Sequence, residues 1–421
     1  MKLLLKNIGQ MITCKGDNTK PKAGKMQSDI GLTENGYIYS ENETIRFEGT
    51  EKEFNEYIKE NPITDDVTEI DCSGKIVLPG LIDSHTHFVF AGSRADEYEM
   101  RIRGCTYEEI AEAGGGIANT VIAVRSATKN ELMSEGKKRL NNFFRMGTLT
   151  VEGKSGYGLD VENEMKLLEV MCALNDNTEN KTEVIPTFLG AHSVPPEMSK
   201  KEYVNLICNE MLPKIKNFNG RIKFIDAFCE KNYFSAEETD RILTEGKKYN
   251  LIPRIHTDQF YSIGGSDIAI KHKAASIDHL EVLNDDDIKK LHSKNIVATV
   301  LPGVSYFLDI PYAPAKKLIE NEVPLALATD FNPGSCMTQN FRIIFSLASI
   351  KMKLSAEEII NAATFNAAYS LRISDKCGSI EKGKQADLLI YDYKSYKDLI
   401  YNFAMNDIVY IIKKGNLTSV N

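Results

Sequence analysis

The sequence lacks the features that mark several classes of protein. None of its apolar runs approaches the roughly 18 residues of a membrane-spanning helix, and its eight cysteines form no Cys-x-x-Cys pair. We therefore expect no membrane partner, and reduced, buried thiols rather than disulfide bridges or metal ligands. A surplus of positive charge is also missing, because the net charge is −8, and this argues against nucleic acid as a partner. The expected partner is a small molecule.

A secretory signal is missing as well. The apolar part of residues 1–14 is too short for one, and no small-residue cleavage site follows it. We therefore expect a cytoplasmic protein. With 421 residues, of which 42% are hydrophobic and 26% charged, the chain is long enough for one large domain and a smaller one.

Short apolar runs rich in Val, Ile and Leu alternate with polar, helix-period segments from Lys75 onward, which is typical of βα units around a parallel sheet. Eight such runs occur, at residues 75–87, 147–158, 183–193, 221–231, 250–259, 274–282, 295–303 and 323–335. Eight parallel strands close a barrel. One intervening helix is expected to begin at Ser235, with Glu238 completing a capping box. The sequence therefore predicts an α/β fold, a (β/α)8 TIM barrel over residues 79–375.

The two flanks differ from this pattern. Residues 1–78 and 376–421 contain short strand-like pieces broken by Gly, Asn and Pro, and each flank is too thin to form a core alone. Chain ends of a compact body often lie close together. We therefore expect both flanks to pair into one small β-sandwich domain beside the barrel.

The segment PGLIDSHTH, residues 79–87, places His85 and His87 two positions apart at the end of an apolar run. In an extended strand such residues point to the same face, so both rings can reach one metal ion. The alternative is a strand end that carries two polar residues by chance. Further candidate ligands at later strand ends favour the metal site.

Five of the seven histidines lie at or just beyond the ends of predicted strands, namely His85, His87, His192, His256 and His279. The other two, His272 and His292, fall in Lys-rich helical segments and are expected at the surface. Asp330 ends the last predicted strand, where it is either a ligand or a turn-forming residue. Three imidazoles (His85, His87, His256) and the Asp330 carboxylate suit Zn²⁺ or Fe²⁺ with a position left for water. Such an ion lowers the pKa of bound water towards about 7, which indicates hydrolysis.

Several segments together resemble the amidohydrolase superfamily and, within it, the imidazolonepropionase family. That family opens the ring of 4-imidazolone-5-propanoate to give N-formimidoyl-L-glutamate in histidine breakdown. The segment PGLIDSHTH and the tail GSIEKGKQADLLIYD match the superfamily. The narrower resemblance depends on HTHFVFAGSRADEYEMR (85–101), AGGGI (113–117), EGKSGYGLD (152–160), LGAHSVP (189–195), HTDQF (256–260) and TDFNPGS (329–335).

The resemblance implies roles for individual residues. One ion, Zn²⁺ or Fe(II/III), is bound by His85, His87, His256 and Asp330. Substrate-contacting positions match Arg94, Tyr157, His192, Gln259, Asn332, Gly334 and Ser335, with Tyr107 as a weaker candidate. A homodimer is a further expectation from the family. Some amidohydrolases bridge two metals with a carbamylated lysine, but the matched pattern implies a single ion and so gives Lys154 no such role.

Physical chemistry supports parts of this assignment. Arg94 can offer a bidentate fork to the substrate carboxylate, although a loop arginine is usually a solvated charge. The turn from Asn332 to Ser335 offers backbone N–H groups to a second anionic oxygen, unless it is an ordinary tight turn. Tyr157 either contacts the substrate ring or packs.

Related deaminases carry His-x-x-Glu after the fifth strand, whereas this chain has Gln259 at the glutamate position. An amide cannot exchange a proton at neutral pH. We therefore expect Gln259 to orient the ring and the proton transfers to involve His279 and Asp330, with Asp278 either fixing the His279 tautomer or capping the strand. In this hypothesis activated water attacks the lactam carbonyl, and His192 or His279 stabilises the oxyanion.

Two alternatives remain open at this point. One is another mononuclear amidohydrolase that acts on a small acidic cyclic amide or on a heterocyclic amine. Gln259 argues against deamination, and Arg94 argues for an acidic substrate. The other alternative is a non-catalytic relative that keeps the barrel as an assembly module.

Overall fold

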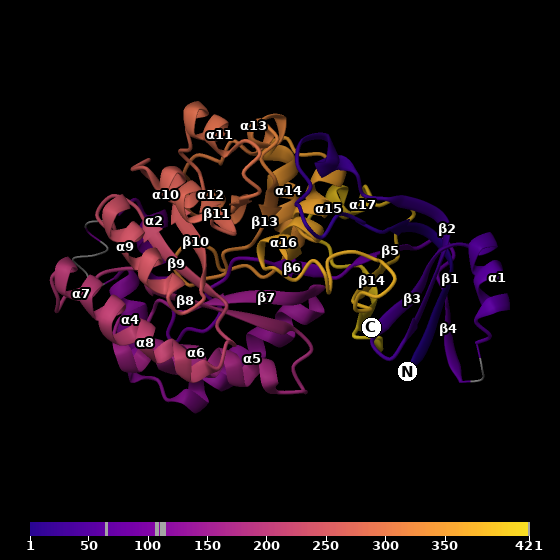
Figure 1. The fold of residues 1–421 in the computed structure, drawn as a ribbon, viewed down its shortest axis with the longest axis horizontal. Helices are drawn as coiled ribbons and strands as arrows, with labels where there is room; N and C mark the ends of the chain where they lie inside the picture. The colour runs from indigo at the N-terminus through magenta and orange to yellow at the C-terminus, as the bar shows by residue number, and fades with distance from the viewer. Residues whose placement is uncertain (64–65, 106–108, 110–114, 420–421) are drawn as a thin grey trace.

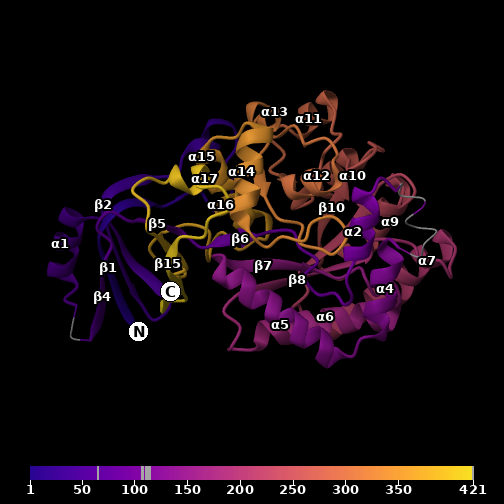
Figure 2. The ribbon, with the colours of Figure 1, turned by 180° about the vertical axis from the view of Figure 1, so that it is seen from behind.

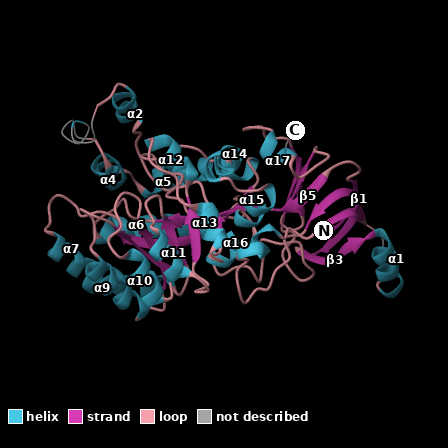
Figure 3. Cartoon of the chain, turned by 90° about the horizontal axis from the view of Figure 1, so that it is seen from above, coloured by secondary structure: helices cyan, strands magenta, loops and turns pink. Residues whose placement is uncertain are grey.

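The computed structural model describes residues 1–63, 66–105, 109 and 115–419. A barrel surrounded by helices lies beside a smaller sheet, and the two bodies form one elongated molecule (Figure 1; seen from behind in Figure 2). Viewed from above, the barrel strands lie inside a ring of helices and the small sheet lies at the other end of the molecule (Figure 3).

The barrel contains eight parallel strands in sequence order, each paired with its neighbours along the chain. They are β6 (Leu81–Asp83), β7 (Thr148–Lys154), β8 (Glu183–Ala191), β9 (Phe224–Cys229), β10 (Ile252–Thr257), β11 (Ser276–His279), β12 (Val297–Val300) and β13 (Leu325–Leu327). Each of the eight predicted runs contains one of these strands. The predicted (β/α)8 barrel is therefore confirmed.

The first and last barrel strands meet at a seam. The Asp330 N–H donates to the His85 carbonyl at 3.0 Å, and the His87 N–H donates to the Phe331 carbonyl at 3.0 Å. Deeper in the barrel, the Asp83 carboxylate accepts hydrogen bonds from the hydroxyl and the N–H of Thr329 at 2.6 and 3.1 Å. Backbone pairing thus closes the barrel just beyond the ends of β6 and β13.

Helices cover the outside of the barrel (Figures 1 and 3). Their bounds are α2 (Ala95–Ile102), α4 (Ile117–Ser126), α5 (Lys129–Arg145), α6 (Val161–Asp176), α7 (Lys200–Leu206), α8 (Leu212–Lys214), α9 (Ala236–Lys247), α10 (Gly265–His272), α11 (Asp285–Leu291), α12 (Pro302–Leu308), α13 (Ala315–Glu320), α14 (Phe341–Met352), α15 (Ala356–Ala362), α16 (Phe365–Ser370) and α17 (Asp398–Tyr401). Short η segments are Gly24–Ser28, Ile207–Met211 and Ile215–Phe218. The predicted capping box of Ser235 and Glu238 is confirmed at the start of α9.

The small sheet combines both chain ends, as predicted. Its strands are β1 (Lys2–Ile12), β2 (Leu32–Glu41), β3 (Thr44–Thr50), β4 (Val67–Asp71), β5 (Ile76–Pro79), β14 (Leu388–Tyr391), β15 (Ile408–Lys413) and β16 (Asn416–Ser419), and helix α1 (Glu51–Glu60) packs on one side. The antiparallel pairing of β5 with β14 joins the two flanks. One buried apolar cluster includes Leu5, Ile38, Val77, Ile390 and Ile412. The domain boundaries after residue 78 and before residue 376 stay predictions.

The predicted run 75–87 serves both sheets. It breaks at Gly80, so that β5 belongs to the small sheet and β6 to the barrel. A Cβ on Gly80 would lie 2.5 Å from Cδ1 of Leu149, so the close approach of β7 requires glycine here. His85 and His87 lie beyond β6, and the seam hydrogen bonds hold their backbone in place.

Three other predictions can be compared with the structure. All eight cysteines are free, and seven are buried, as expected. The surface position of His292 is confirmed, but that of His272 is wrong: His272 is only 4% exposed, since α10 packs on α9 and brings its Nε2 to 2.7 Å from Oδ1 of Asp240. Among the described residues, no helix combines the length and apolar character needed to cross a membrane.

Candidate metal centre and substrate pocket

Four side chains from strands far apart in the sequence meet at the carboxyl end of the barrel. Oδ1 of Asp330 lies 3.5 Å from Nε2 of His85 and 3.5 Å from Nε2 of His87. Nε2 of His256 lies 3.5 Å from Nε2 of His87. Two atoms bound to one tetrahedral zinc ion at about 2.1 Å would be separated by roughly 3.4 Å. The observed spacing therefore suits a single ion between these side chains.

Two of these rings are held by a second carboxylate. Nδ1 of His85 lies 2.8 Å from Asp278 on β11, and Nδ1 of His256 lies 2.9 Å from Asp226 on β9. A carboxylate accepts only, so Nδ1 of His85 carries the proton and its Nε2 keeps a free lone pair. Nδ1 of His256 lies at ion-pair distance from Asp226. Burial lowers the pKa of both rings below its ordinary value. Neutral imidazoles with free Nε2 atoms are the form that binds metal.

The site leaves buried polar atoms without partners. Nε2 of His85 and Oδ1 of Asp330 are inaccessible to solvent and form no hydrogen bond with any described residue. Burial raises the pKa of Asp330 to about 6, although the nearby His279 acts in the opposite direction. Unpartnered buried lone pairs are costly, and a cation would satisfy them. The residues present therefore fit a divalent ion.

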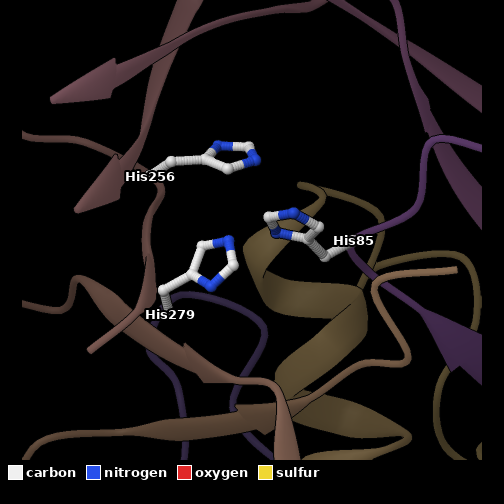
Figure 4. A group of neighbouring side chains, drawn as sticks. All are labelled: His85, His256 and His279. Carbon is white, nitrogen blue, oxygen red and sulfur yellow. The ribbon is translucent and has the colours of Figure 1, made fainter. Parts of the chain in front are cut away.

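His279 lies against this centre at the end of β11. The rings of His85, His256 and His279 point towards a common space (Figure 4), and one nitrogen from each lies within 4.8 Å of the others. Nδ1 of His279 lies 3.4 Å from Oε1 of Glu281. Burial disfavours the charged ring, but Glu281 and Asp330 together raise the pKa of His279 above its ordinary value. Its nitrogen can therefore hold a proton near neutral pH.

The backbone around His279 is strained. His279 and Leu280 have φ values of +83° and +74°, a region that non-glycine residues rarely adopt. Such strain persists only where the surrounding structure enforces it, and it is concentrated at functional sites. The strain therefore supports a chemical role for His279.

A cavity of about 350 Å³ opens above the centre. Every predicted substrate-contacting residue that the structure describes lines it: Arg94, Tyr157, His192, Gln259, Asn332, Gly334 and Ser335. His87, His256, His279 and Asp330 also line the cavity, whereas His85 is fully buried. Tyr107 lies outside the described residues.

The guanidinium of Arg94 lies directly against the backbone of Gly334. A Cβ on Gly334 would lie 2.0 Å from Nη1 of Arg94, so the guanidinium occupies the space that a side chain would fill. Nε of Arg94 also donates to Glu97 at 2.8 Å. Arg94 therefore reaches the cavity in a fixed position with its charge partly balanced.

The turn after Asp330 differs from the expectation. The N–H groups of Gly334 and Ser335 donate to Oδ1 of Asn332 at 2.8 and 2.9 Å, which forms a local Asx turn. The expectation that these groups are free for a second anionic oxygen is therefore wrong. Ser335 contributes its hydroxyl, which lies 3.3 Å from Oδ2 of Asp330.

His192 and Tyr157 form one side of the cavity beside His87. Nδ1 of His192 donates to the Gly156 carbonyl at 3.0 Å, and its ring stacks on His87 with 4.9 Å between centroids. Burial and the neighbouring His256 lower the pKa of His192 to about 3. His192 is therefore neutral, with Nε2 available only as an acceptor.

Comparison with known proteins places this chain in a family. The Amidohydrolase family matches residues 76–420. The imidazolonepropionase of Christiangramia forsetii is 43% identical over 99% of this chain and 100% of that protein. The imidazolonepropionase of Clostridium tetani is 41% identical over 99% of this chain and 97% of that protein. The chain belongs to the amidohydrolase family and, within it, to the imidazolonepropionase family.

Solved structures of other proteins share the fold of this amidohydrolase. A zinc-bound adenosine deaminase from Xanthomonas campestris has a TM-score of 0.70 at 15% identity, covering 99% of this chain and 92% of the other. The zinc complex of atrazine chlorohydrolase from Arthrobacter aurescens has a TM-score of 0.70 at 16% identity, covering 99% and 94%. At this identity the likeness concerns the fold alone.

Beneath the candidate metal centre of this amidohydrolase lies a buried charged network that the sequence motifs indicated only in part. Nζ of Lys154 lies 2.7 Å from Asp226 and 2.9 Å from Glu152. Arg254 lies 3.0 Å from Glu152 and 3.3 Å from Asp278. All five side chains are fully buried. Lys154 thus holds Asp226, which in turn holds His256.

The sequence motifs raised possible roles for Lys154 and Asp278, but they indicated no role for Glu152, Asp226 or Arg254. A signal existed, because charged residues interrupt the otherwise apolar strands β7, β9 and β10, and buried charges need partners. The motifs also indicated no role for Glu281 beside His279. Arg101, Phe228 and Tyr233 line the cavity and were missed too.

Proposed function

We propose that this protein hydrolyses the ring of 4-imidazolone-5-propanoate to N-formimidoyl-L-glutamate, a step of L-histidine degradation. The observation that carries the proposal is one cavity that joins a divalent-metal ligand set to the guanidinium of Arg94. The curated relatives named imidazolonepropionase, at about 40% identity along the whole chain, support this substrate.

In this proposal, His85, His87, His256 and Asp330 hold one divalent ion, either zinc or iron. The bound ion supplies a water nucleophile at neutral pH. Imidazole and carboxylate ligands suit both metals, so activity after reconstitution of metal-free protein with each ion distinguishes them.

His279 receives the proton of the attacking water, because Glu281 and Asp330 increase the proton affinity of its ring. Once protonated, the same ring donates to the oxyanion that develops on the lactam carbonyl. His192 is unsuited to that role, since it is neutral and its only N–H donates to Gly156. Its Nε2 instead accepts a hydrogen bond from a ring N–H of the substrate.

Asp330 takes the second proton of the attacking water and passes it to the departing ring nitrogen, while the first proton stays on His279 until the products leave. Gln259 orients the ring by hydrogen bonding and transfers no proton. Tyr157 packs on the ring, while Arg94 and the turn of Asn332 to Ser335 position the propanoate arm. Remote binding energy thereby places the carbonyl carbon above the metal centre.

The direct test is an assay of purified, metal-loaded protein that follows the loss of imidazolone-propanoate absorbance. We expect turnover and formation of N-formimidoyl-L-glutamate, with no turnover after chelation. Turnover of a neutral cyclic amide or a heterocyclic amine, but not of imidazolone-propanoate, would favour the alternative amidohydrolase substrate. Substoichiometric metal and no hydrolysis of any of these compounds would favour a non-catalytic relative.

A cytoplasmic location and a homodimer also stay proposals. The eight free cysteines support a reducing compartment. Cell fractionation tests the location, and sedimentation of the purified protein tests the dimer.

A further inference from the structure

Arg101 in α2 lines the cavity, although the family resemblance assigned it no role. Its Nη1 atom is inaccessible to solvent and has no hydrogen-bond partner among the described residues. Its guanidinium lies over the ring of Phe307, with 5.7 Å from Cζ to the ring centroid. An aromatic ring fixes a guanidinium in place without neutralising it. The side chain therefore lines the cavity with a guanidinium whose Nη1 has no hydrogen-bond acceptor among the described residues.

The two arginines of the cavity differ in their partners. Arg94 pairs with Glu97 at 2.8 Å, and Glu97 also accepts from Asn119 at 3.2 Å. Arg101 forms no ion pair with any residue in the described ranges. The net positive charge of this side of the cavity thus comes from Arg101.

The positive charges of the Arg94 and Arg101 guanidiniums repel each other. Burial, together with the nearby charge of Arg94, lowers the pKa of Arg101 from its ordinary value. Like charges that converge in a partly buried pocket repel each other, and an anion bound between them relieves the repulsion. The turn of Asn332 to Ser335 cannot supply this compensation through its Gly334 and Ser335 N–H groups, because Asn332 already engages them.

We infer that Arg101 is a second substrate-binding residue, which supplies the uncompensated charge that attracts and holds the substrate carboxylate. Arg94, already balanced by Glu97, fixes the direction of that carboxylate. This inference rests on the proposed function, because the ligand is taken to be the propanoate arm of the imidazolone substrate.

The first experiment compares the steady-state kinetics of metal-loaded Arg101→Met with those of Arg103→Met. Arg103 belongs to the same segment but is 74% exposed and pairs with Glu99 at 2.6 Å. A lost charge-assisted hydrogen bond should raise KM for Arg101→Met by about 10- to 100-fold. Its kcat should change less than about threefold, since the reacting atoms keep their contacts. Arg103→Met should match the wild type.

Arg101→Lys keeps the charge and shortens the reach. We expect it to recover part of the KM, which a purely structural role of Arg101 would not require. A KM for Arg101→Met equal to that of Arg103→Met would overturn the inference. If Arg101→Met does not fold, an unchanged KM in Arg101→Lys together with Arg101→Gln would overturn it equally.

A second experiment measures binding without turnover. Calorimetry on metal-loaded protein compares 3-(imidazol-4-yl)propanoate with its uncharged propanamide. Arg101→Met should weaken binding of the acid by about 10- to 100-fold and binding of the amide by less than about twofold. Equal losses for both ligands would overturn the inference.

The two proposals can fail separately. If the wild type binds the acid but does not hydrolyse imidazolone-propanoate, the proposed function is wrong. A selective loss of acid binding in Arg101→Met would still support the carboxylate site. If the wild type hydrolyses the substrate and Arg101→Met has an unchanged KM, only the role of Arg101 falls.

Discussion

At the floor of the cavity, the candidate metal ligands His85 and His256 each lie against a buried carboxylate, and those carboxylates are paired with Lys154 and Arg254. The wall, formed by Arg94, Arg101 and the turn of residues 332–335, has no such support for Arg101. The floor is built on barrel strands, whereas the wall is built on a helix and two loops.

This difference assigns different consequences to the two regions. The charged side chains beneath the floor are paired with one another, so a lost partner leaves a buried charge and is expected to affect both stability and metal binding. On the wall, we propose that the ligand compensates the charge of Arg101, so losing that side chain is expected to affect affinity. Substitutions in each region test whether the floor controls stability and metal binding while the wall controls substrate affinity.

The largest effect is expected at a metal ligand. His256→Ala removes one of the four proposed donors, so metal content should fall well below one equivalent and kcat by about 10³-fold or more. Elemental analysis and the imidazolone-propanoate assay measure both. His292→Ala, at an exposed histidine, is the control and should retain full metal and activity. Wild-type metal content in His256→Ala would contradict the ligand set.

A smaller effect is expected beneath the ligands. Lys154→Met leaves Glu152 and Asp226 short of a cation, so we expect metal affinity to fall by about 10- to 100-fold and the free energy of unfolding by about 3–5 kcal/mol. Chelator competition and urea denaturation measure these changes. Glu152→Gln added to Lys154→Met restores the charge balance and should recover part of the stability.

Lys129→Met is a matched control for that experiment, because Lys129 forms an exposed ion pair with Glu169. It should change the free energy of unfolding by less than about 1 kcal/mol. If Lys154→Met behaved like Lys129→Met, the floor would not depend on its buried charges and the comparison would fail.

An effect confined to affinity is expected on the wall. Gly334→Ala places a methyl group where Nη1 of Arg94 now lies, so we expect KM to rise by about tenfold because the carboxylate fork is displaced. Metal content should stay at the wild-type level. Metal loss in Gly334→Ala would show that wall and floor are coupled.

The smallest effect is expected at the rim. Phe260 lines the cavity but is 41% exposed, so Phe260→Ala should shift the free energy of unfolding by less than about 0.5 kcal/mol. Its KM should change less than that of Gly334→Ala. A larger rise in KM than for Gly334→Ala would extend the specificity-determining wall to the rim.

Much of the barrel could be predicted from the sequence, because each strand is a short apolar run bounded by polar segments. The break of the run 75–87 at Gly80 was not foreseen, since nothing in an apolar run tells which of two sheets each half joins. His272 was misjudged for a similar reason. Its burial depends on how α10 packs on α9, and the Lys-rich local sequence gives no sign of that packing.

Candidate site residues near motifs could be named, and the structure brings the described ones to one cavity. The roles of Asp226 and Glu152 could not be predicted from the sequence, because some of their partners lie on other strands and only the closed barrel brings these side chains together. Arg101 was missed because a helical arginine reads as a solvated surface charge, and its missing partner becomes visible only when its surroundings are known.

The hydrogen bond between His85 and Asp330 across the seam has a consequence for biosynthesis. In the proposed ligand set, His85 and His87 follow the first barrel strand and Asp330 follows the last, so a nascent chain that ends before residue 330 lacks one of the four side chains. We therefore expect full metal affinity only after residue 330 has left the ribosome. The ion would then bind with full affinity only to a barrel whose first and last strands have already met.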